Sequence, residues 1–501
     1  MSTPIYHLND EGNGRRLVDK HGHEILYCPD DKHWYIYDAV RWCKDATGQI
    51  RERVKALCDD IRRDAKSSPS KLPDEDEEHY DKRKAARKEA MLRWALQTGN
   101  SPTISRAVQA AQTDPRILCR MTDFDREHLL LNCPNGVVDL RTGDLLPHDK
   151  RYKLSRLCPT EYDPSATHPI FESNLAAYTR NHPDLAPFLK RLIGYCLQGD
   201  KVEERIVLIH GPASTGKGTF IDSIMNAFGS DYACTMASTS VEKQPRTAQS
   251  ASGDLARLHG MRLVIVSEFE KNLKLQESFM KLVSGNDSIV ARAMYESEVE
   301  FKPTHQMVFQ SNHRPKFDST DSGNLRRYIE IPFDNNLKED KLVTFDPTLK
   351  LRMRRDPDYL KAVLNWCVQG CVEWCRDGLL IPSSVETATK ELFAANDFLA
   401  EFLSDCFVKD AVGFVPVEVV SITYQSWCAD RKEKSVEGRT FNAMMKERGY
   451  KYKQKNSRAN NRKCWFGLRI KENKDSLRAP KKETSSALEA LFDIDKEQSV
   501  N

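Results

Sequence analysis

A glycine-rich loop between an apolar run and an amphipathic segment is the part of this chain best suited to chemistry. Ile206–Ile209 reads as a buried strand, and apolar residues recur at helical spacing over residues 220–228. Between them, Gly211, four residues and then Gly216–Lys217 form the Walker A spacing, whose backbone N–H groups and lysine hold nucleotide phosphates. The predicted phosphate-binding residues are Gly211, Pro212, Ala213, Ser214, Thr215, Gly216, Lys217, Gly218 and Thr219.

The metal side of this site departs from the usual pattern. The residue after the lysine is normally a Ser or Thr whose hydroxyl binds Mg²⁺, but here it is Gly218, and the hydroxyl follows at Thr219. A second apolar run ends in Ser267 and Glu268, so Ser267 stands where many such ATPases carry a magnesium-binding Asp. Thr219 and Glu268 are therefore the expected protein ligands of Mg²⁺, with water completing the shell.

Four downstream residues could complete ATP hydrolysis. Glu268, about 50 residues after the lysine, suits a general base. Asn312 follows the apolar run Gln306–Gln310 and could hydrogen-bond both the γ-phosphate and the attacking water. Arg326 or Arg327 could reach a neighbouring subunit's γ-phosphate as an arginine finger. Asn312 could instead be an ordinary turn asparagine. The two arginines could instead be a solvated surface pair.

A hairpin is expected just before the strand that ends in Asn312. Ile289–Met294 and Val299–Lys302 flank a polar turn. Such a hairpin could project into the channel of a ring and contact DNA, and a purely structural hairpin fits the pattern equally well. The candidate DNA contacts are Arg292, Lys302 and, for base stacking, Tyr295.

Charge is concentrated near the C-terminus. The whole chain of 501 residues has a formal net charge of +3, yet residues 431–482 carry 18 Lys/Arg against 5 Asp/Glu. The preceding pattern predicts helices at 398–406, 417–431 and 439–448 and strands at 450–455 and 463–470. Three helices and a hairpin are typical of a winged helix, whose third helix usually enters the DNA major groove. The candidate DNA-binding residues are Arg439, Lys446, Lys453, Lys455, Arg458 and Arg462.

The N-terminal region has a mixed pattern. Aromatic alternation over residues 26–42 predicts short strands, and helical spacing follows over 50–61. The acidic run 74–78 reads as an exposed loop, and 82–96 as a basic helix. Fourteen cysteines without paired CxxC spacing favour neither a zinc site nor a disulfide framework. No apolar run approaches the ~20 residues that span a bilayer, so a cytoplasmic protein of a bacterium or of a virus's host cell is expected.

Five segments occur in an order more specific than any one of them. They are Gly211–Phe220, Arg262–Glu268, Lys281–Arg292, Phe309–Pro315 and Leu325–Phe333. In this order they resemble the superfamily 3 helicases, and within them the primase-helicases of phages, plasmids and poxviruses. Residues 131–145 and 162–164 look like the helical domain before the ATPase in that family, and 398–470 like its C-terminal winged helix.

The resemblance implies a multidomain α/β and α+β protein. Its expected parts are a mostly helical N-terminal domain (1–170), an AAA+-like P-loop ATPase (171–380), a winged helix (390–470) and a flexible charged tail (471–501). It also implies a homo-hexameric ring that uses ATP and Mg²⁺. The implied roles are phosphate binding by Lys217 and Thr219, water activation by Glu268, γ-phosphate sensing by Asn312, and a finger at Arg326 or Arg327.

The expected function is that of a replicative DNA helicase or replication initiator of a phage, prophage or plasmid. Single-stranded and forked DNA, and an origin duplex, are the expected partners. No primase domain is recognisable, so a separate primase or polymerase would act beside it. The alternative is an ATP-switched origin-binding assembly factor without processive unwinding. A third candidate, a nucleotide kinase, shares the Gly-Lys-Gly-Thr sequence but fits the flanking domains poorly.

Overall fold

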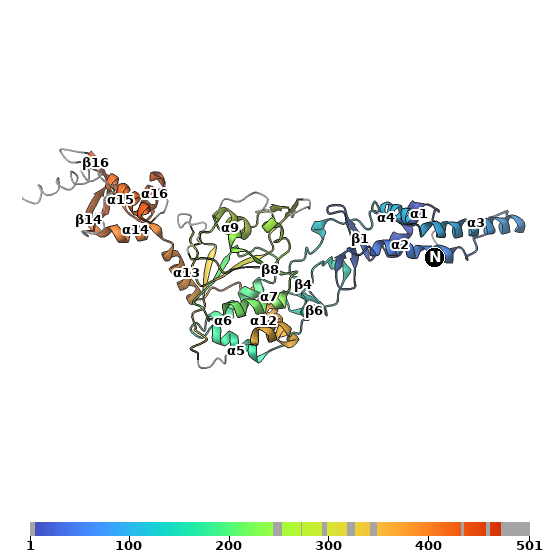
Figure 1. Cartoon of the computed structure of the whole chain (residues 1–501), viewed down its shortest axis with the longest axis horizontal. Helices are drawn as coiled ribbons and strands as arrows, with labels where there is room; N and C mark the ends of the chain where they lie inside the picture. The colour runs from blue at the N-terminus through green and yellow to red at the C-terminus, as the bar shows by residue number, and fades with distance from the viewer. Residues whose placement is uncertain are drawn as a thin grey trace, which may run out of the picture. The chain divides into compact units, whose positions relative to one another are not determined.

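The chain falls into two compact units. Their helices and strands are labelled in Figure 1. The first comprises residues 1–315 and 327–388, and the second comprises 316–326 and 389–501. The computed structural model describes residues 6–243, 253–271, 273–292, 298–317, 326–340, 348–431, 435–456 and 461–471.

Four helices and a small sheet form the start of the first unit. The helices are α1 (Asp10–His21), α2 (Gln49–Asp64), α3 (Glu77–Thr98) and α4 (Ser101–Ala111). The antiparallel sheet is β1 (Ile25–Cys28), β2 (His33–Tyr37) and β3 (Trp42–Lys44). Leu17, Val54 and Ile104 are buried in one apolar core that α1, α2 and α4 form with β1 and β2, whereas α3 packs on α2 through a separate cluster. The strands and the helix expected near 50–61 are confirmed, whereas α1 and α4 go beyond the sequence prediction.

Helix α3 begins earlier than its sequence pattern suggests. The acidic run expected to be a loop supplies the start of the helix instead. Asp76 is the N-cap, and its carboxylate accepts a hydrogen bond from the backbone N–H of His79 at 2.8 Å. Glu77 and Glu78 occupy the first turn, where negative charge is favourable because it faces the positive end of the helix dipole.

A second antiparallel sheet follows these helices in the chain. It contains β4 (Leu130–Cys133), β5 (Gly136–Asp139) and β6 (Asp144–Leu146). The region before residue 170 is helical as predicted, and two three-stranded sheets are an addition to that prediction. Its strands are only three to five residues long, too short to show clear periodicity.

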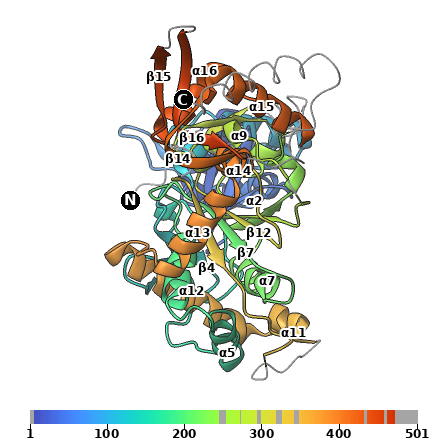
Figure 2. The same cartoon turned by 90° about the vertical axis from the view of Figure 1, so that its left-hand side faces the viewer.

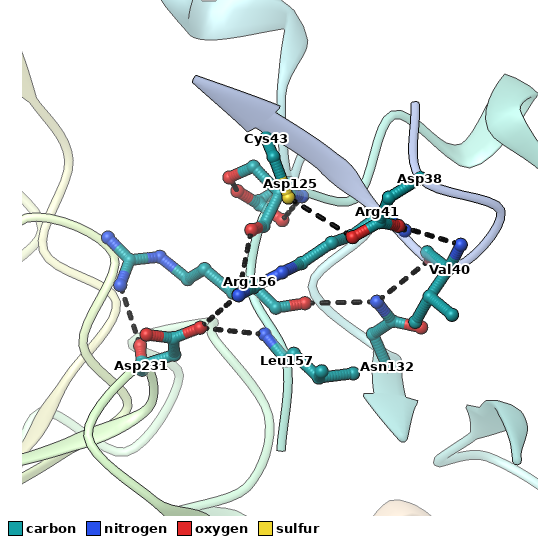
Figure 3. A network of polar contacts seen from close by, with 10 residues as sticks. Asp38, Val40, Arg41, Cys43, Asp125, Asn132, Arg156, Leu157 and Asp231 are labelled. Carbon is teal, nitrogen blue, oxygen red and sulfur yellow. Dashed lines mark hydrogen bonds and ion pairs between the residues drawn. The ribbon is translucent and has the colours of Figure 1, made fainter. Parts of the chain in front are cut away.

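A polar network joins this N-terminal region to the segments around the central sheet (Figure 3). The carboxylate of Asp231 accepts hydrogen bonds from Arg41 Nη1 at 2.5 Å and from the backbone N–H of Leu157 at 3.0 Å. Arg156 Nη1 donates to the Asp231 carbonyl at 2.6 Å. The Asn132 amide donates to the Arg156 carbonyl at 3.1 Å. Asp231 lies just beyond the helix that follows the phosphate loop, so the network fixes that helix end.

A five-stranded parallel sheet forms the centre of the first unit, in the order β13-β7-β12-β9-β8. Four of its strands coincide with predicted apolar runs, and β8 does not. The strands are β7 (Ile206–His210), β8 (Ala233–Met236), β9 (Leu263–Ser267), β12 (Gln306–Ser311) and β13 (Tyr328–Pro332). A separate hairpin pairs β10 (Ile289–Ala291) with β11 (Val299–Phe301).

Helices cover the sheet and bury its apolar side chains. Val207, Ile265 and Val308 share one large core with Phe220 and Ile224 of α7. The helices of this unit are α5 (Pro169–Tyr178), α6 (Leu185–Tyr195), α7 (Lys217–Phe228), α9 (Glu277–Ser284), α11 (Leu349–Arg355) and α12 (Pro357–Asp377). Helix α13 (Ser383–Ala395) runs from this unit into the next.

Helices α6 and α12 touch backbone to backbone. A Cβ on Gly194 would lie 2.1 Å from the Cys371 nitrogen, and one on Gly370 would lie 1.9 Å from the Lys190 carbonyl oxygen. Only glycine allows so close an approach. No helix within the described ranges is long and apolar enough to cross a membrane.

The second unit has its own core around Phe402 and Trp465. Its elements are α14 (Phe398–Cys406), β14 (Phe407–Pro416), α15 (Val417–Asp430), α16 (Gly438–Glu447), β15 (Lys451–Asn456) and β16 (Asn461–Ile470). The three predicted helices and the hairpin are present (Figure 2). Strand β14 is an addition to the prediction. It pairs with β16 through a register shift between Lys409 and Phe414, which interrupts the alternation that sequence reasoning needs.

Candidate functional site

The phosphate loop joins β7 to α7 and is shaped by two glycines. A Cβ on Gly211 would lie 1.8 Å from the Phe333 carbonyl oxygen. Gly216 has φ of +84° and packs against the Tyr178 ring, which a Cβ would meet at 2.1 Å. Ser214 also has a left-handed φ, of 66°, and its carbonyl accepts a hydrogen bond from Leu337 N–H at 3.0 Å. The loop is thus held in one shape by the segment after β13.

Lys217 begins α7 and is 6% exposed. Its ammonium donates hydrogen bonds to the carbonyl oxygens of Gly211 at 2.7 Å and Pro212 at 2.6 Å. Burial lowers the pKa of Lys217 to about 8, so it is still mostly cationic at neutral pH. A buried ammonium inside a glycine-shaped loop at a helix N-terminus fits the phosphates of a nucleoside triphosphate.

The carboxyl edge of the sheet brings the other predicted catalytic residues beside this loop. Strand β12 lies between β7 and β9, and Gln310 is paired with Ile209 on one side and Ser267 on the other. Glu268 and Asn312 are the first residues beyond β9 and β12, and both are exposed. The Glu268 backbone has a left-handed φ of 55°, and its N–H donates to the Gln310 carbonyl at 3.3 Å.

The expected magnesium ligands are placed less directly. Thr219 lies in the first turn of α7 and is half-buried, and Glu268 lies on the sheet edge. Among the described residues there is no group of three His, Cys, Asp or Glu side chains that could hold a metal ion. A magnesium ion here would therefore be bound largely by nucleotide phosphates and water, as is usual for Mg²⁺.

Sequence reasoning missed a buried ion-pair network behind Asn312. Arg314 forms a bidentate pair with Glu330 of β13, with Nε–Oε2 at 2.9 Å and Nη2–Oε1 at 2.7 Å. Glu330 is 1% exposed, and His210 Nδ1 lies 3.2 Å from its Oε1. The network ties the segment after β12 to both β13 and β7. The only sequence signal is an acid inside an apolar strand, because such a residue must have a partner.

The predicted arginine pair lies at the other end of the strands. Arg327 directly precedes β13, and its carbonyl accepts a hydrogen bond from the N–H of Ile206, the first residue of β7, at 2.6 Å. Its guanidinium contacts Ser284 Oγ at 3.2 Å and Glu204 at 3.4 Å. This is the amino edge of the sheet, opposite the phosphate loop. Arg327 therefore does not reach the loop of its own subunit, and Arg326 is its exposed chain neighbour.

The predicted DNA contacts divide between the β10–β11 hairpin and the second unit. Arg292 and Lys302 are exposed and flank the hairpin strands. Tyr295 and Arg458 lie outside the described residues, as does the tail after Lys471. The remaining candidates are in the second unit: Arg439 and Lys446 on α16, Lys453 and Lys455 on β15, and Arg462 on β16.

Three of the candidates in the second unit are exposed side chains on neighbouring elements. Arg439 and Lys446 are seven residues apart on α16, about two helical turns, which places them on one face. The Lys446 ammonium lies 5.3 Å from the centre of the Tyr452 ring, so α16 runs beside β15 (Figure 2). Lys453 is exposed on the same strand. A polyanion could contact the helix and the strand together.

Comparison with known proteins finds three family matches along the chain. Residues 14–178 match the family described as D5 N terminal like, and residues 394–476 match the family Poxvirus D5 protein-like. Residues 209–327, which contain the phosphate loop, match a family of unknown function (DUF5906).

Two curated viral proteins and a solved structure are also similar. "Putative helicase L207/L206" of Acanthamoeba polyphaga mimivirus is 25% identical over 59% of this chain and 32% of its own length. "Putative helicase 022R" of Frog virus 3 is 21% identical over 46% of this chain and 25% of its own length. The chain thus spans a third or less of these relatives. The NrS-1 C-terminal region is 13% identical, with a TM-score of 0.47, over 92% of this chain and all of that one.

Proposed function

We propose that this chain, which belongs to the D5-type primase-helicases of helicase superfamily 3, is an ATP-driven DNA helicase of a viral or other mobile-element replication system. One observation carries the proposal. The phosphate loop with Lys217, the acid Glu268 and the amide Asn312 come from three adjacent strands and meet at one sheet edge. The helicase names of the two viral relatives support DNA as the substrate.

The chemistry of hydrolysis follows from these positions. Backbone N–H groups of the loop and the Lys217 ammonium bind the β- and γ-phosphates. Glu268 accepts a proton from the attacking water, and Asn312 orients that water and the γ-phosphate. Bound Mg²⁺ supplies positive charge that neutralises the phosphates. The bidentate pair of Arg314 with Glu330 holds the segment that carries Asn312, so the amide is pre-positioned.

The finger and the ring form part of the same proposal. Arg327 lies at the amino edge of the sheet, so Arg326 or Arg327 would act on nucleotide bound by a neighbouring subunit. For Arg327 this requires its guanidinium to leave Ser284 and Glu204. An AAA+-like homo-hexameric ring would place each arginine pair at the next subunit's phosphate loop and point the β10–β11 hairpins at one DNA strand.

The second unit is proposed to be a winged helix that grips duplex or forked DNA. Its order of α14, β14, α15, α16, β15 and β16, with β14 paired to β16, supports this. Helix α16 would then enter the major groove with Arg439 and Lys446, and β15 would contact the backbone through Lys453. Contacts of this kind are to phosphates and would weaken steeply with salt.

DNA-stimulated ATP hydrolysis tests the proposal. Wild-type protein should hydrolyse ATP faster with forked DNA, and Lys217→Ala should abolish hydrolysis because the phosphate-binding cation is lost. Lys361→Ala is the matched control, since it removes a lysine of α12 that pairs with Glu161 at 2.7 Å away from the loop. Hydrolysis that ignores DNA, together with no unwinding, would contradict the helicase proposal. ATP-dependent assembly on origin duplex without unwinding would instead indicate the assembly factor.

A further inference from the structure

Gly218 stands out among the loop glycines because the backbone does not require it. Gly211 and Gly216 are fixed by close contacts, and Gly216 also by a left-handed φ. Gly218 is helical and has no left-handed φ, and outside its own helix an added Cβ would meet no backbone atom within 4 Å. The backbone alone would therefore admit the serine or threonine that is usual at this position.

Two side chains border the space where that hydroxyl would stand. An ideal Cβ on Gly218 would lie 3.4 Å from Gln310 Nε2 and 3.8 Å from Lys350 Nζ. Lys350 is paired with Asp222 at 3.1 Å and is 58% exposed. Gln310 is half-buried and belongs to the central strand of the site. Of the two, the glutamine is the more rigidly placed.

The sheet register directs Gln310 toward the phosphate loop. Val308, two residues earlier on β12, lies in the core shared with α7, and side chains two residues apart in a strand share a face. Gln310 is paired in parallel register with Ser267, which stands in the usual position of the magnesium-binding Asp. Gly218, Ser267 and Gln310 thus lie around one point, where two of the usual ligand groups are missing.

We propose that Gln310 takes the place of the missing hydroxyl at residue 218 and holds the Mg²⁺ of bound nucleotide through its side-chain oxygen, directly or through one water. The proposal rests on the proposed ATPase function. An amide oxygen is a ligand that Mg²⁺ accepts. The two ends of a glutamine amide exchange by a flip about the last side-chain bond, so either end can face this point. Gln310 would also link the metal to Glu268, whose N–H donates to its backbone carbonyl.

The test is the gain in nucleotide affinity that Mg²⁺ provides. A fluorescent ATP analogue is titrated into the full chain, once with Mg²⁺ and once with EDTA. The readout is the Kd in EDTA divided by the Kd with Mg²⁺. Gln310→Ala should reduce this ratio by about 10- to 100-fold, the usual effect of losing a group that supports a metal site, and leave the Kd in EDTA unchanged. Gln310→Glu keeps an oxygen at the site and should retain the ratio. This second variant keeps the test valid if Gln310→Ala folds poorly.

Two further variants make the result specific. Gln369→Ala is the matched control, because Gln369 is also half-buried and its Nε2 lies 3.4 Å from an ideal Cβ on Gly143, in α12 rather than at the loop. It should leave the ratio unchanged. Adding Gly218→Ser to Gln310→Ala restores the hydroxyl in the space that the glutamine leaves, and should recover most of the lost ratio.

The outcomes separate the two proposals. A wild-type chain that fails to bind the analogue under either condition would overturn the ATPase function and this inference with it. A wild-type chain with a clear Mg²⁺-dependent gain that Gln310→Ala retains in full would overturn the inference alone. Equal losses of affinity with Mg²⁺ and with EDTA would also overturn it, since they would mean that Gln310 contacts phosphate or only supports the fold.

Discussion

Arg314→Ala removes the bidentate partner of Glu330, whose carboxylate is 1% exposed. Breaking a buried ion pair by deleting one partner typically costs about 3–5 kcal/mol, because the other charge stays desolvated. Arg314 itself is 27% exposed, which places the expected loss near the lower end, about 3 kcal/mol. The substitution also frees the segment that carries Asn312, so ATP turnover should fall while nucleotide affinity is retained.

Local measurements suit this prediction because a multidomain chain need not unfold in one step. Hydrogen-exchange mass spectrometry should show lost protection in peptides that cover β12 and β13. Arg376→Ala is the matched control, since it removes a bidentate pair with Asp377 on the surface, where Arg376 is 72% exposed. Adding Glu330→Gln to Arg314→Ala should restore part of the protection by removing the buried charge. Equal protection in Arg314→Ala and Arg376→Ala would refute the reasoning.

Three other outcomes are expected. Nucleotide affinity should fall as pH rises through about 8, because phosphate binds the ammonium form of Lys217, whose pKa burial lowers to about 8; a flat affinity profile up to pH ~9.5 would contradict this. Gly194→Ala should destabilise the α6–α12 pair by about 1–3 kcal/mol, seen as faster hydrogen exchange in peptides of these helices, whereas Gly438→Ala, which meets nothing within 4 Å, should leave that exchange unchanged. The double variant Arg326→Ala/Arg327→Ala should lose ATPase activity and regain part of it when mixed with Lys217→Ala protein, if the arginine finger acts between subunits. No regain on mixing would count against a finger that acts between subunits.

The parts of the site that are continuous in the chain could be predicted from the sequence. The run Ile206–Ile209, the glycine loop and Lys217 are neighbours in the chain, and the physics that predicts a phosphate site there is local. Glu268 and Asn312 could also be predicted, because each directly follows an apolar run and the carboxyl ends of parallel strands share an edge.

The rest of the site depends on pairings between distant segments. Nothing in the apolar runs themselves shows that β12 lies between β7 and β9, and that order alone brings Gln310 next to Gly218. The pair of Arg314 with Glu330 joins the segment after β12 to β13, between residues 16 apart in the chain. Strand β14 was missed because Asp410 and Gly413 interrupt its alternation, and its register shift restores pairing only in three dimensions.

Unwinding of a forked DNA by wild-type and Glu268→Gln protein tests the central claim most directly. Glu268 stands at the sheet edge, and glutamine keeps the size of its side chain while removing the basic carboxylate, so the glutamine variant should still bind nucleotide and fork. Wild-type protein should separate the fork only with ATP, and Glu268→Gln should not separate it at all. Separation by the glutamine variant at the wild-type rate, or a wild-type protein that hydrolyses ATP and leaves the fork intact, would contradict the account.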